Sequence, residues 1–182
     1  MLPLDGVRDH CPMRIDDAAD GDAEAIATIY NHVVATSTAV FSDRPVTAMD
    51  RREWMRERRG DGFPVLVARG TDGLAVGFAS YGRFRPWPGY GSTVEHSVHV
   101  AESQRRRGIG RQLVQALIER ARAAGNHVMV AGLDADNLAS RRLHEQLGFR
   151  EVARMPEVAR KFDRWVDLLL LALILDGPDR SP

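Results

Sequence analysis

The chain has 182 residues, 44% of them apolar, which is enough for one compact domain with a buried core. Lysine plus arginine and aspartate plus glutamate balance at 25 each, so no overall field favours nucleic acid or a membrane surface. The single cysteine, Cys11, excludes an internal disulfide framework and a cysteine-rich zinc site.

Nothing in the sequence indicates export or insertion into a membrane. No N-terminal stretch joins basic residues to an apolar run of signal-peptide length. The longest apolar run, residues 168–175, falls far short of the roughly 20 residues that a spanning helix needs, and it is typical of a buried strand. A single cysteine fits a reducing, cytoplasmic setting. We expect an N-terminal extension at residues 1–12, one domain at residues 13–176 and a tail at residues 177–182.

Helical and alternating patterns divide the first half of the chain. Residues 35–45 carry no strong period, although Val40 and Phe41 offer an apolar wall for a pocket. The charged helix that follows has arginines that we expect to face solvent, and residues 70–73 signal a hairpin turn. The expected elements are a strand at 13–16, helices at 20–35 and 47–59, and strands at 64–69 and 74–81.

The loop over residues 82–90 interleaves arginines with aromatic residues. A guanidinium fork from Arg83 or Arg85 would suit a carboxylate, and a plain surface loop is the alternative. A strand at 93–100 follows, in which Thr93, Glu95 and Ser97 would share one face if alternation holds.

A glycine-rich turn joins that strand to an amphipathic helix at residues 108–124. The first turn of a helix has unpaired N–H groups, glycine lets an anion approach them, and arginines add charge-assisted hydrogen bonds, so the turn suits a diphosphate. A solvated basic turn is the alternative. The dinucleotide fingerprint fits badly, because Leu113 stands where its third glycine would be. The turn reads Gln104, Arg105, Arg106, Arg107, Gly108, Ile109, Gly110 and Arg111.

The last helix carries a polar stripe. Asn137, Ser140 and His144 fall at i, i+3 and i+7 and therefore lie along one side of it. The expected elements after the glycine-rich turn are a strand at 127–131, a helix at 137–147, and strands at 149–155 and 162–175.

Three of these segments together resemble the GCN5-related N-acetyltransferase (GNAT) superfamily. Residues 104–110 resemble its acyl-CoA pyrophosphate loop, residues 93–100 its pantetheine-binding strand, and residues 137–149 the helix and strand that finish the coenzyme cleft. Residues 29–31, 39–41, 79–82, 94–98, 143–144 and 161–165 carry a narrower likeness, to the phosphinothricin and methionine sulfoximine N-acetyltransferases, which covers residues 13–175. The resemblance implies a single α+β domain, in which about four helices flank a central, mixed but mostly antiparallel twisted sheet of about seven strands.

The resemblance implies acetyl transfer from acetyl-CoA to an amine. An α-amino acid arrives mostly as its ammonium, so a base must remove a proton before the nitrogen attacks. By similarity that base is Glu95, acting directly or through a water. His144 stands where many relatives place a tyrosine that protonates the departing thiolate. The alternatives are a solvated or ion-paired carboxylate for Glu95 and a packed helix histidine with one structural hydrogen bond for His144.

The resemblance also implies binding residues. Arg83 and Arg85 would grip the carboxylate or phosphinate of the acceptor. Arg83 stands where relatives often carry an acid, and His99 replaces a frequent tyrosine, which leaves the acceptor preference open. The implied coenzyme contacts are Ser97, Val98, His99, Val100, Arg105, Arg106, Arg107, Gly108, Ile109, Gly110, Arg111, Asn137 and Ser140, and the implied acceptor contacts are Tyr30, Phe41, Tyr81, Arg83, Arg85 and Glu95.

The leading hypothesis is an N-acetyltransferase for the α-amine of a small amino-acid-like acceptor such as phosphinothricin, methionine sulfoximine or methionine sulfone. Alternatives change the acceptor to a polyamine, an antibiotic or a protein N-terminus, or make the protein a non-catalytic acyl-CoA-binding regulator. The resemblance implies a homodimer. We expect no metal site and no membrane partner, and the short arginine cluster argues against nucleic acid.

Overall fold

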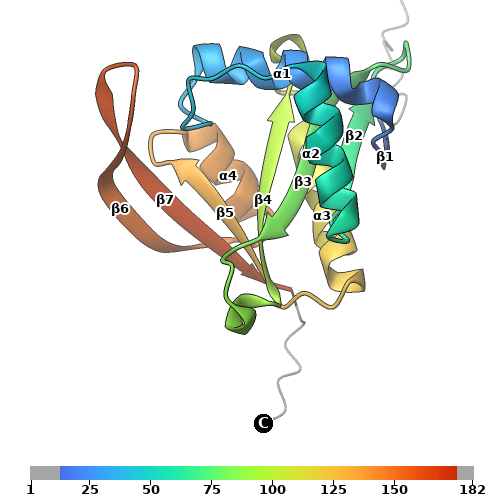
Figure 1. Ribbon diagram of the computed structural model, residues 1–182. Helices are drawn as coiled ribbons and strands as arrows, with labels where there is room; N and C mark the ends of the chain where they lie inside the picture. Colours follow the sequence, from blue (N-terminus) through green and yellow to red (C-terminus); the bar gives the residue numbers. More distant parts are fainter. Residues whose placement is uncertain (1–12, 176–182) are drawn as a thin grey trace, which may run out of the picture.

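The computed structural model describes residues 13–175 as one seven-stranded sheet flanked by helices (Figure 1). The predicted extension, with Cys11, and the predicted tail lie outside these residues. The strands are β1 (Arg14–Asp17), β2 (Val65–Arg69), β3 (Ala75–Arg83), β4 (Thr93–Val100), β5 (Val128–Asp134), β6 (Arg150–Lys161) and β7 (Arg164–Ile174). The α-helices are α1 (Ala23–Thr36), α2 (Ala48–Gly60), α3 (Ile109–Ala123) and α4 (Leu138–Gln146), and short 3-10 helices span Asp20–Asp22, Pro88–Tyr90 and Glu102–Gln104.

The sheet is mixed but mostly antiparallel, in the order β1-β2-β3-β4-β5-β7-β6, so the predicted α+β fold is confirmed. Only β4 and β5 run parallel, and their pairing covers Thr93–His96 against residues 128–131. Both strands continue beyond that pairing, to Val100 and Asp134, and Figure 1 shows them diverging. The sheet therefore opens between β4 and β5 at His96.

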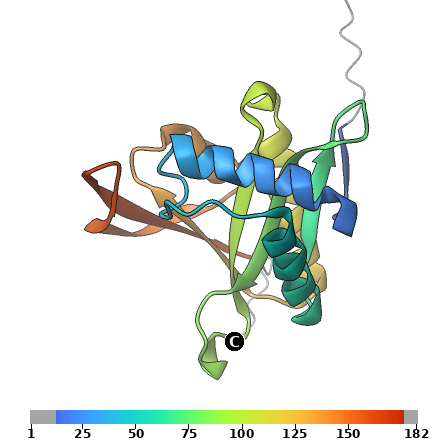
Figure 2. The same ribbon diagram turned by 45° about the horizontal axis from the view of Figure 1, so that its top comes forward.

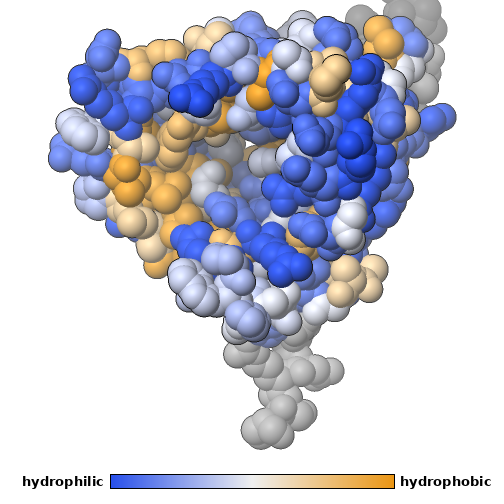
Figure 3. All heavy atoms as spheres, viewed as in Figure 1, coloured by the Kyte–Doolittle hydropathy of each residue, from blue (hydrophilic) through white to orange (hydrophobic). Residues whose placement is uncertain are grey.

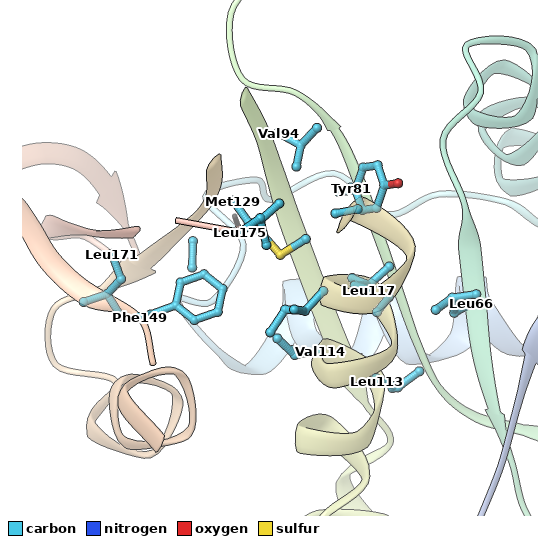
Figure 4. Close-up of a cluster of buried hydrophobic side chains, with 14 of the residues drawn as sticks. Leu66, Tyr81, Val94, Leu113, Val114, Leu117, Met129, Phe149, Leu171 and Leu175 are labelled. Atoms are coloured by element: carbon cyan, nitrogen blue, oxygen red, sulfur yellow. The ribbon is translucent and has the colours of Figure 1, made fainter. Parts of the chain in front are cut away.

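Two apolar clusters hold helices against opposite faces of the sheet. On one face α3 buries Leu113, Val114 and Leu117, which Figure 4 shows among side chains of the sheet. On the other face α1 and α2, which Figures 1 and 2 show together, bury Ile26 and Met55. Each buried side chain of this size contributes about 1.5–3 kcal/mol. Consecutive residues of β3 and β4 consequently face two different helical layers.

The helices begin and end close to their predicted positions, whereas three strands run further than predicted. Thr47 caps α2 by accepting a hydrogen bond from the Asp50 amide. β5 continues to Asp134, β3 to Arg83 and β6 to Lys161. Most of β6 is exposed on both faces, so it lacks the apolar alternation that would have marked it in the sequence. No helix in residues 13–175 is long and apolar enough to cross a membrane.

The arginines of α2 do not all face solvent, which corrects the prediction for this helix. Arg51 is buried, and its guanidinium carbon lies 3.9 Å from the centroid of the Tyr30 ring and 5.1 Å from that of Trp54. Burial lowers the pKa of Arg51. The helix therefore brings cationic groups inward, onto the sheet face that it shares with α1.

Candidate active site

The turn before α3 has the backbone geometry that a close anion contact needs. Gly108 precedes the helix at φ 80 with no side-chain cap, and Arg106 also has a positive φ of 62. A Cβ on Gly110 would lie 3.2 Å from Leu143 Cδ1, so glycine lets α3 approach α4 closely at this point. The start of α3 presents backbone N–H groups at the end of a helix that carries a partial positive charge.

The four arginines of the turn take different positions. Arg105 donates from Nε to the carbonyl of Val100 at 3.2 Å, and Arg107 donates to the Gln104 side chain at 2.6 Å. Arg105, Arg106 and Arg111 line the large cavity described next, and Arg107 does not. Three of the four predicted guanidinium groups are therefore beside the cavity.

A cavity of about 1100 Å³ begins at this turn and extends between β4 and β5. That volume is of the order expected for a site that encloses a large ligand. Figure 3 shows the molecular surface hollowed between α1, α2 and the β6–β7 hairpin. Among the predicted site residues, those that line the cavity are Ser97, Val98, His99, Val100, Arg105, Arg106, Gly108, Ile109, Gly110, Arg111, Asn137, Ser140 and His144.

The polar stripe of α4 contributes a further part of the cavity wall. Asn137 caps the helix, since its side chain accepts from the Ser140 amide at 3.1 Å. The Ser140 carbonyl accepts a hydrogen bond from His144 Nδ1 at 2.7 Å, because a carbonyl oxygen can only accept. Two of the three stripe residues therefore bond to the helix itself as well as lining the cavity.

His144 forms a buried pair with His96, a residue that the sequence patterns did not single out. The two Nε2 atoms lie 3.2 Å apart, and the rings are 5.0 Å apart between centroids. Burial lowers the pKa of both groups, and that of His96 falls to about 3 with the charges of His144 and His99 adding to burial. With its proton on Nδ1, neutral His144 accepts at Nε2 from His96. Its role as the acid stays a prediction.

Glu95 lies on the face of β4 that is opposite to His96. Its half-buried carboxylate adjoins the cavity-lining Gly132, where a Cβ would lie 3.1 Å from Oε1 and 3.4 Å from Leu168 Cδ1. Burial raises the pKa of Glu95, and the charge of Arg85 partly offsets that rise. A carboxylate with a raised pKa in a partly apolar setting suits proton transfer near neutral pH.

The predicted acceptor residues do not all reach this face. Tyr81 pairs with His96 and Arg83 with Val94, so strand alternation directs both toward the α3 layer. Tyr81 is 2% exposed within the core cluster that includes α3, and Arg83 does not share the Glu95 face. Both placements follow from the register of β3, which puts Gly82 beside Glu95 instead.

The other acceptor predictions are placed around the cavity rather than in its wall. Tyr30 packs edge-on against His99 at 5.9 Å between ring centroids, and Phe41 is 41% exposed. Neither lines the cavity. Arg85 stacks on Phe84 at 4.1 Å and is the cation whose charge acts on Glu95.

A buried aspartate, which the sequence patterns also missed, fixes the loop between α1 and α2. Asp134, 3% exposed at the end of β5, accepts hydrogen bonds from the Thr38 hydroxyl and the Asp136 amide, and Arg164 lies 3.5 Å away. Lys161 donates to the Val40 carbonyl at 2.7 Å from the other side. In the sequence, Asp134 and Asp136 shortly precede Asn137, the N-cap of α4, and this pair of acidic residues is the signal that could have identified the contact.

The described part of the chain contains no group of three or more histidine, cysteine, aspartate or glutamate side chains placed to hold a metal ion. The site is formed by the start of α3 at Gly108, the separated ends of the parallel strands β4 and β5, and the half-buried carboxylate of Glu95. Residues 26–149 match the family model described as the acetyltransferase (GNAT) family. The chain belongs to this family and is an N-acetyltransferase.

Named relatives match nearly the whole chain. An L-methionine sulfoximine/L-methionine sulfone acetyltransferase of Pseudomonas aeruginosa is 48% identical over 92% of this chain and 96% of its own length. A phosphinothricin N-acetyltransferase of Streptomyces coelicolor is 33% identical over 86% of this chain and 92% of its own. The yncA protein of Salmonella typhimurium, solved with its cofactor acetyl-CoA, superposes with a TM-score of 0.88 at 44% identity, covering 93% of this chain and 99% of that one.

Proposed function

We propose that the protein transfers an acetyl group from acetyl-CoA to the α-amine of a small amino-acid-like acceptor of the methionine sulfoximine, methionine sulfone or phosphinothricin type. The observation that carries the proposal is the Glu95 carboxylate, which is half-buried beside Gly132, a residue that lines the cavity. The names of the relatives supply the acceptor class.

The cavity has features that fit acetyl-CoA. The positive φ of Gly108 and the close contact at Gly110 form a cradle that a Cβ would disturb, and Arg105, Arg106 and Arg111 surround it with positive charge. Backbone N–H groups and arginines are the partners that a diphosphate prefers. When bound, acetyl-CoA supplies the thioester carbonyl that an amine attacks.

Glu95 is the residue that we expect to remove a proton from the acceptor ammonium. The amine cannot attack while it is protonated, so the base must hold that proton before the new C–N bond forms. Burial raises the pKa of Glu95, which makes its carboxylate a better proton acceptor. The closeness of its carboxylate to Gly132, which lines the cavity, supports this role.

The test is acetylation of an acceptor panel by wild type and Glu95→Gln, followed by thiol release. We expect wild type to acetylate methionine sulfoximine, methionine sulfone or phosphinothricin, and Glu95→Gln to lose roughly 10²–10⁴-fold in kcat. The matched control is Glu53→Gln, which removes an exposed carboxylate of α2. Unchanged kcat in Glu95→Gln, with calorimetry showing intact acetyl-CoA binding, would overturn the role of Glu95.

We also propose a cytoplasmic homodimer that forms through the β6–β7 hairpin. The hairpin extends away from the body of the molecule (Figure 1) and exposes a row of large apolar side chains, whereas most monomers avoid contiguous apolar patches of this kind. Light scattering should give twice the monomer mass for wild type and the monomer mass for Trp165→Glu; a wild-type monomer contradicts the proposal. The exposed apolar residues are Val152, Met155, Val158, Phe162 and Trp165.

A further inference from the structure

The guanidinium of Arg58 occupies the place that a side chain at residue 82 would fill. A Cβ built on Gly82 would lie 1.6 Å from Arg58 Nη1 and 2.6 Å from Cζ. Such a contact is impossible, so the guanidinium can keep this position only while residue 82 is glycine. The backbone of Arg58 is itself fixed, because its carbonyl accepts a hydrogen bond from the Phe63 amide at 2.8 Å.

Gly82 is the direct antiparallel partner of Glu95. Paired residues point to the same face of a sheet, and their Cβ positions lie about 4.5–5.5 Å apart. The Arg58 guanidinium therefore lies over β3, on the same face of the sheet as the Glu95 side chain, whose carboxylate lies on the β5 side against Gly132. Figure 3 shows hydrophilic side chains along the α2 side of the hollow in this face.

The Arg58 guanidinium has no counterion among residues 13–175. It takes part in none of the hydrogen bonds or ion pairs found there, and its one aromatic neighbour, Trp54, lies 5.9 Å from Cζ at the ring centroid. The next residue differs, since Arg59 donates to the Asp20 carboxylate and to the Ala18 carbonyl, each at 2.9 Å. A partly buried cation without a partner favours binding of an anion.

An α-amino acid carries its carboxylate on the same carbon atom as its amine. A site for it therefore needs a base and a cation on one face, separated by no more than the length of the amino acid, and Glu95 and Arg58 lie on the same face of neighbouring strands. We propose that Arg58, seated on Gly82, binds the α-carboxylate of the acceptor while Glu95 takes the proton from its amine. The inference rests on the proposed function and gives Arg58 the carboxylate contact that the sequence resemblance implied for Arg83 and Arg85.

The experiment compares an α-amino acid acceptor with its carboxamide, which keeps the amine and loses the negative charge. For Arg58→Ala we expect KM for the acid to rise roughly 10- to 100-fold, as loss of one charge-assisted contact predicts, while KM for the carboxamide changes little. Arg58→Lys should restore only part of the affinity, because it keeps the charge but not the fork. The matched control is Arg56→Ala, an exposed arginine of the same helix.

Gly82→Ala tests the same contact without touching the arginine. The new Cβ must displace the guanidinium, so this variant should also lose discrimination between acid and carboxamide while calorimetry shows that it still binds acetyl-CoA. Calorimetric binding of the acid and the carboxamide to wild type and Arg58→Ala gives the answer without turnover. If wild type acetylates neither compound, the proposed function fails; if Arg58→Ala weakens both compounds equally, or neither, only the present inference is overturned.

Discussion

His99 is buried, and the effect of this burial on its charge can be tested by measuring the free energy of unfolding. His99 is 8% exposed, and its ring packs against Tyr30 and Phe78 at 5.9 and 5.1 Å between centroids. Burial, together with the charges of Arg51 and Arg105, lowers the pKa of His99 from 6.5 to about 4. The substitution His99→Phe keeps an aromatic ring among aromatic neighbours and removes the titrating group.

The lowered pKa sets both the sign and the size of the expected effect. Between pH 6.5 and about 4 the unfolded chain binds a proton at this histidine and the folded protein does not, so acidification favours the unfolded state. Each pH unit in this window is worth about 1.4 kcal/mol, so lowering the pH from 6.5 to about 5 should remove about 2 kcal/mol of unfolding free energy through His99. The His99→Phe variant should not lose this part of the unfolding free energy on acidification.

Urea unfolding of both proteins, followed by tryptophan fluorescence at about pH 8, 6.5 and 5, measures the difference. The lowered pKa of His96 acts in the same direction as that of His99, and the raised pKa of Glu95 acts in the opposite direction, but both groups are present in both proteins and cancel. The paired carboxylates Asp16 and Asp22 have lowered pKa values and titrate below this window. Parallel loss of stability in the two proteins would show that His99 is not held neutral.

Three other substitutions test the site itself. Gly108→Ala puts a side chain at φ 80, which costs about 1–2 kcal/mol, so we expect a lower urea midpoint and weaker acetyl-CoA binding by calorimetry; no change in either contradicts the cradle. His96→Phe removes the donor to His144, so the ¹⁵N signal of His144 Nε2 should shift in NMR spectra, and an unmoved signal would show that the two rings are not bonded. Gly132→Ala places a Cβ 3.1 Å from Glu95 Oε1, so kcat should fall several-fold while the urea midpoint hardly changes, and full activity would show that the carboxylate has room to move.

Local signals were sufficient to predict most of the fold. β4 spans Thr93–Val100 as predicted, and α3 begins beside the glycines that its predicted start rested on. Both elements combine a clear apolar period with a turn or glycine at each end, so the sequence alone predicts where they begin and end. β6 has neither signal, because its length depends on pairing with β7 through two register shifts. That pairing depends on how the folded strands align and not on the local sequence of β6.

The cofactor side of the site was easier to predict than the acceptor side. Its predicted residues lie in consecutive stretches of chain, so one glycine-rich turn and one helix stripe identify a substantial part of the cavity wall. The acceptor side depends on which residues of β3 lie opposite Glu95. Alternation shows that Tyr81 and Arg83 share a face, but only the register shows that this face belongs to α3. The contacts of Arg51 and Arg58 likewise could not be predicted, because they depend on where α2 packs on the sheet.

The opening between β4 and β5 explains why these separate features form one site. The parallel pairing ends at His96, so the β5-facing backbone groups of residues 97–100 have no partner in β5, and a bound chain-like ligand can bond to them. Glu95 and His96 are consecutive and therefore face opposite sides of the sheet at that same point. One side carries the half-buried Glu95 carboxylate, and the other carries the His96–His144 pair, which burial keeps neutral. Residues 97–100 of β4 and 131–134 of β5, which lie at or beyond the end of the pairing, all line the cavity, so the length of the β4–β5 pairing sets where the cavity forms.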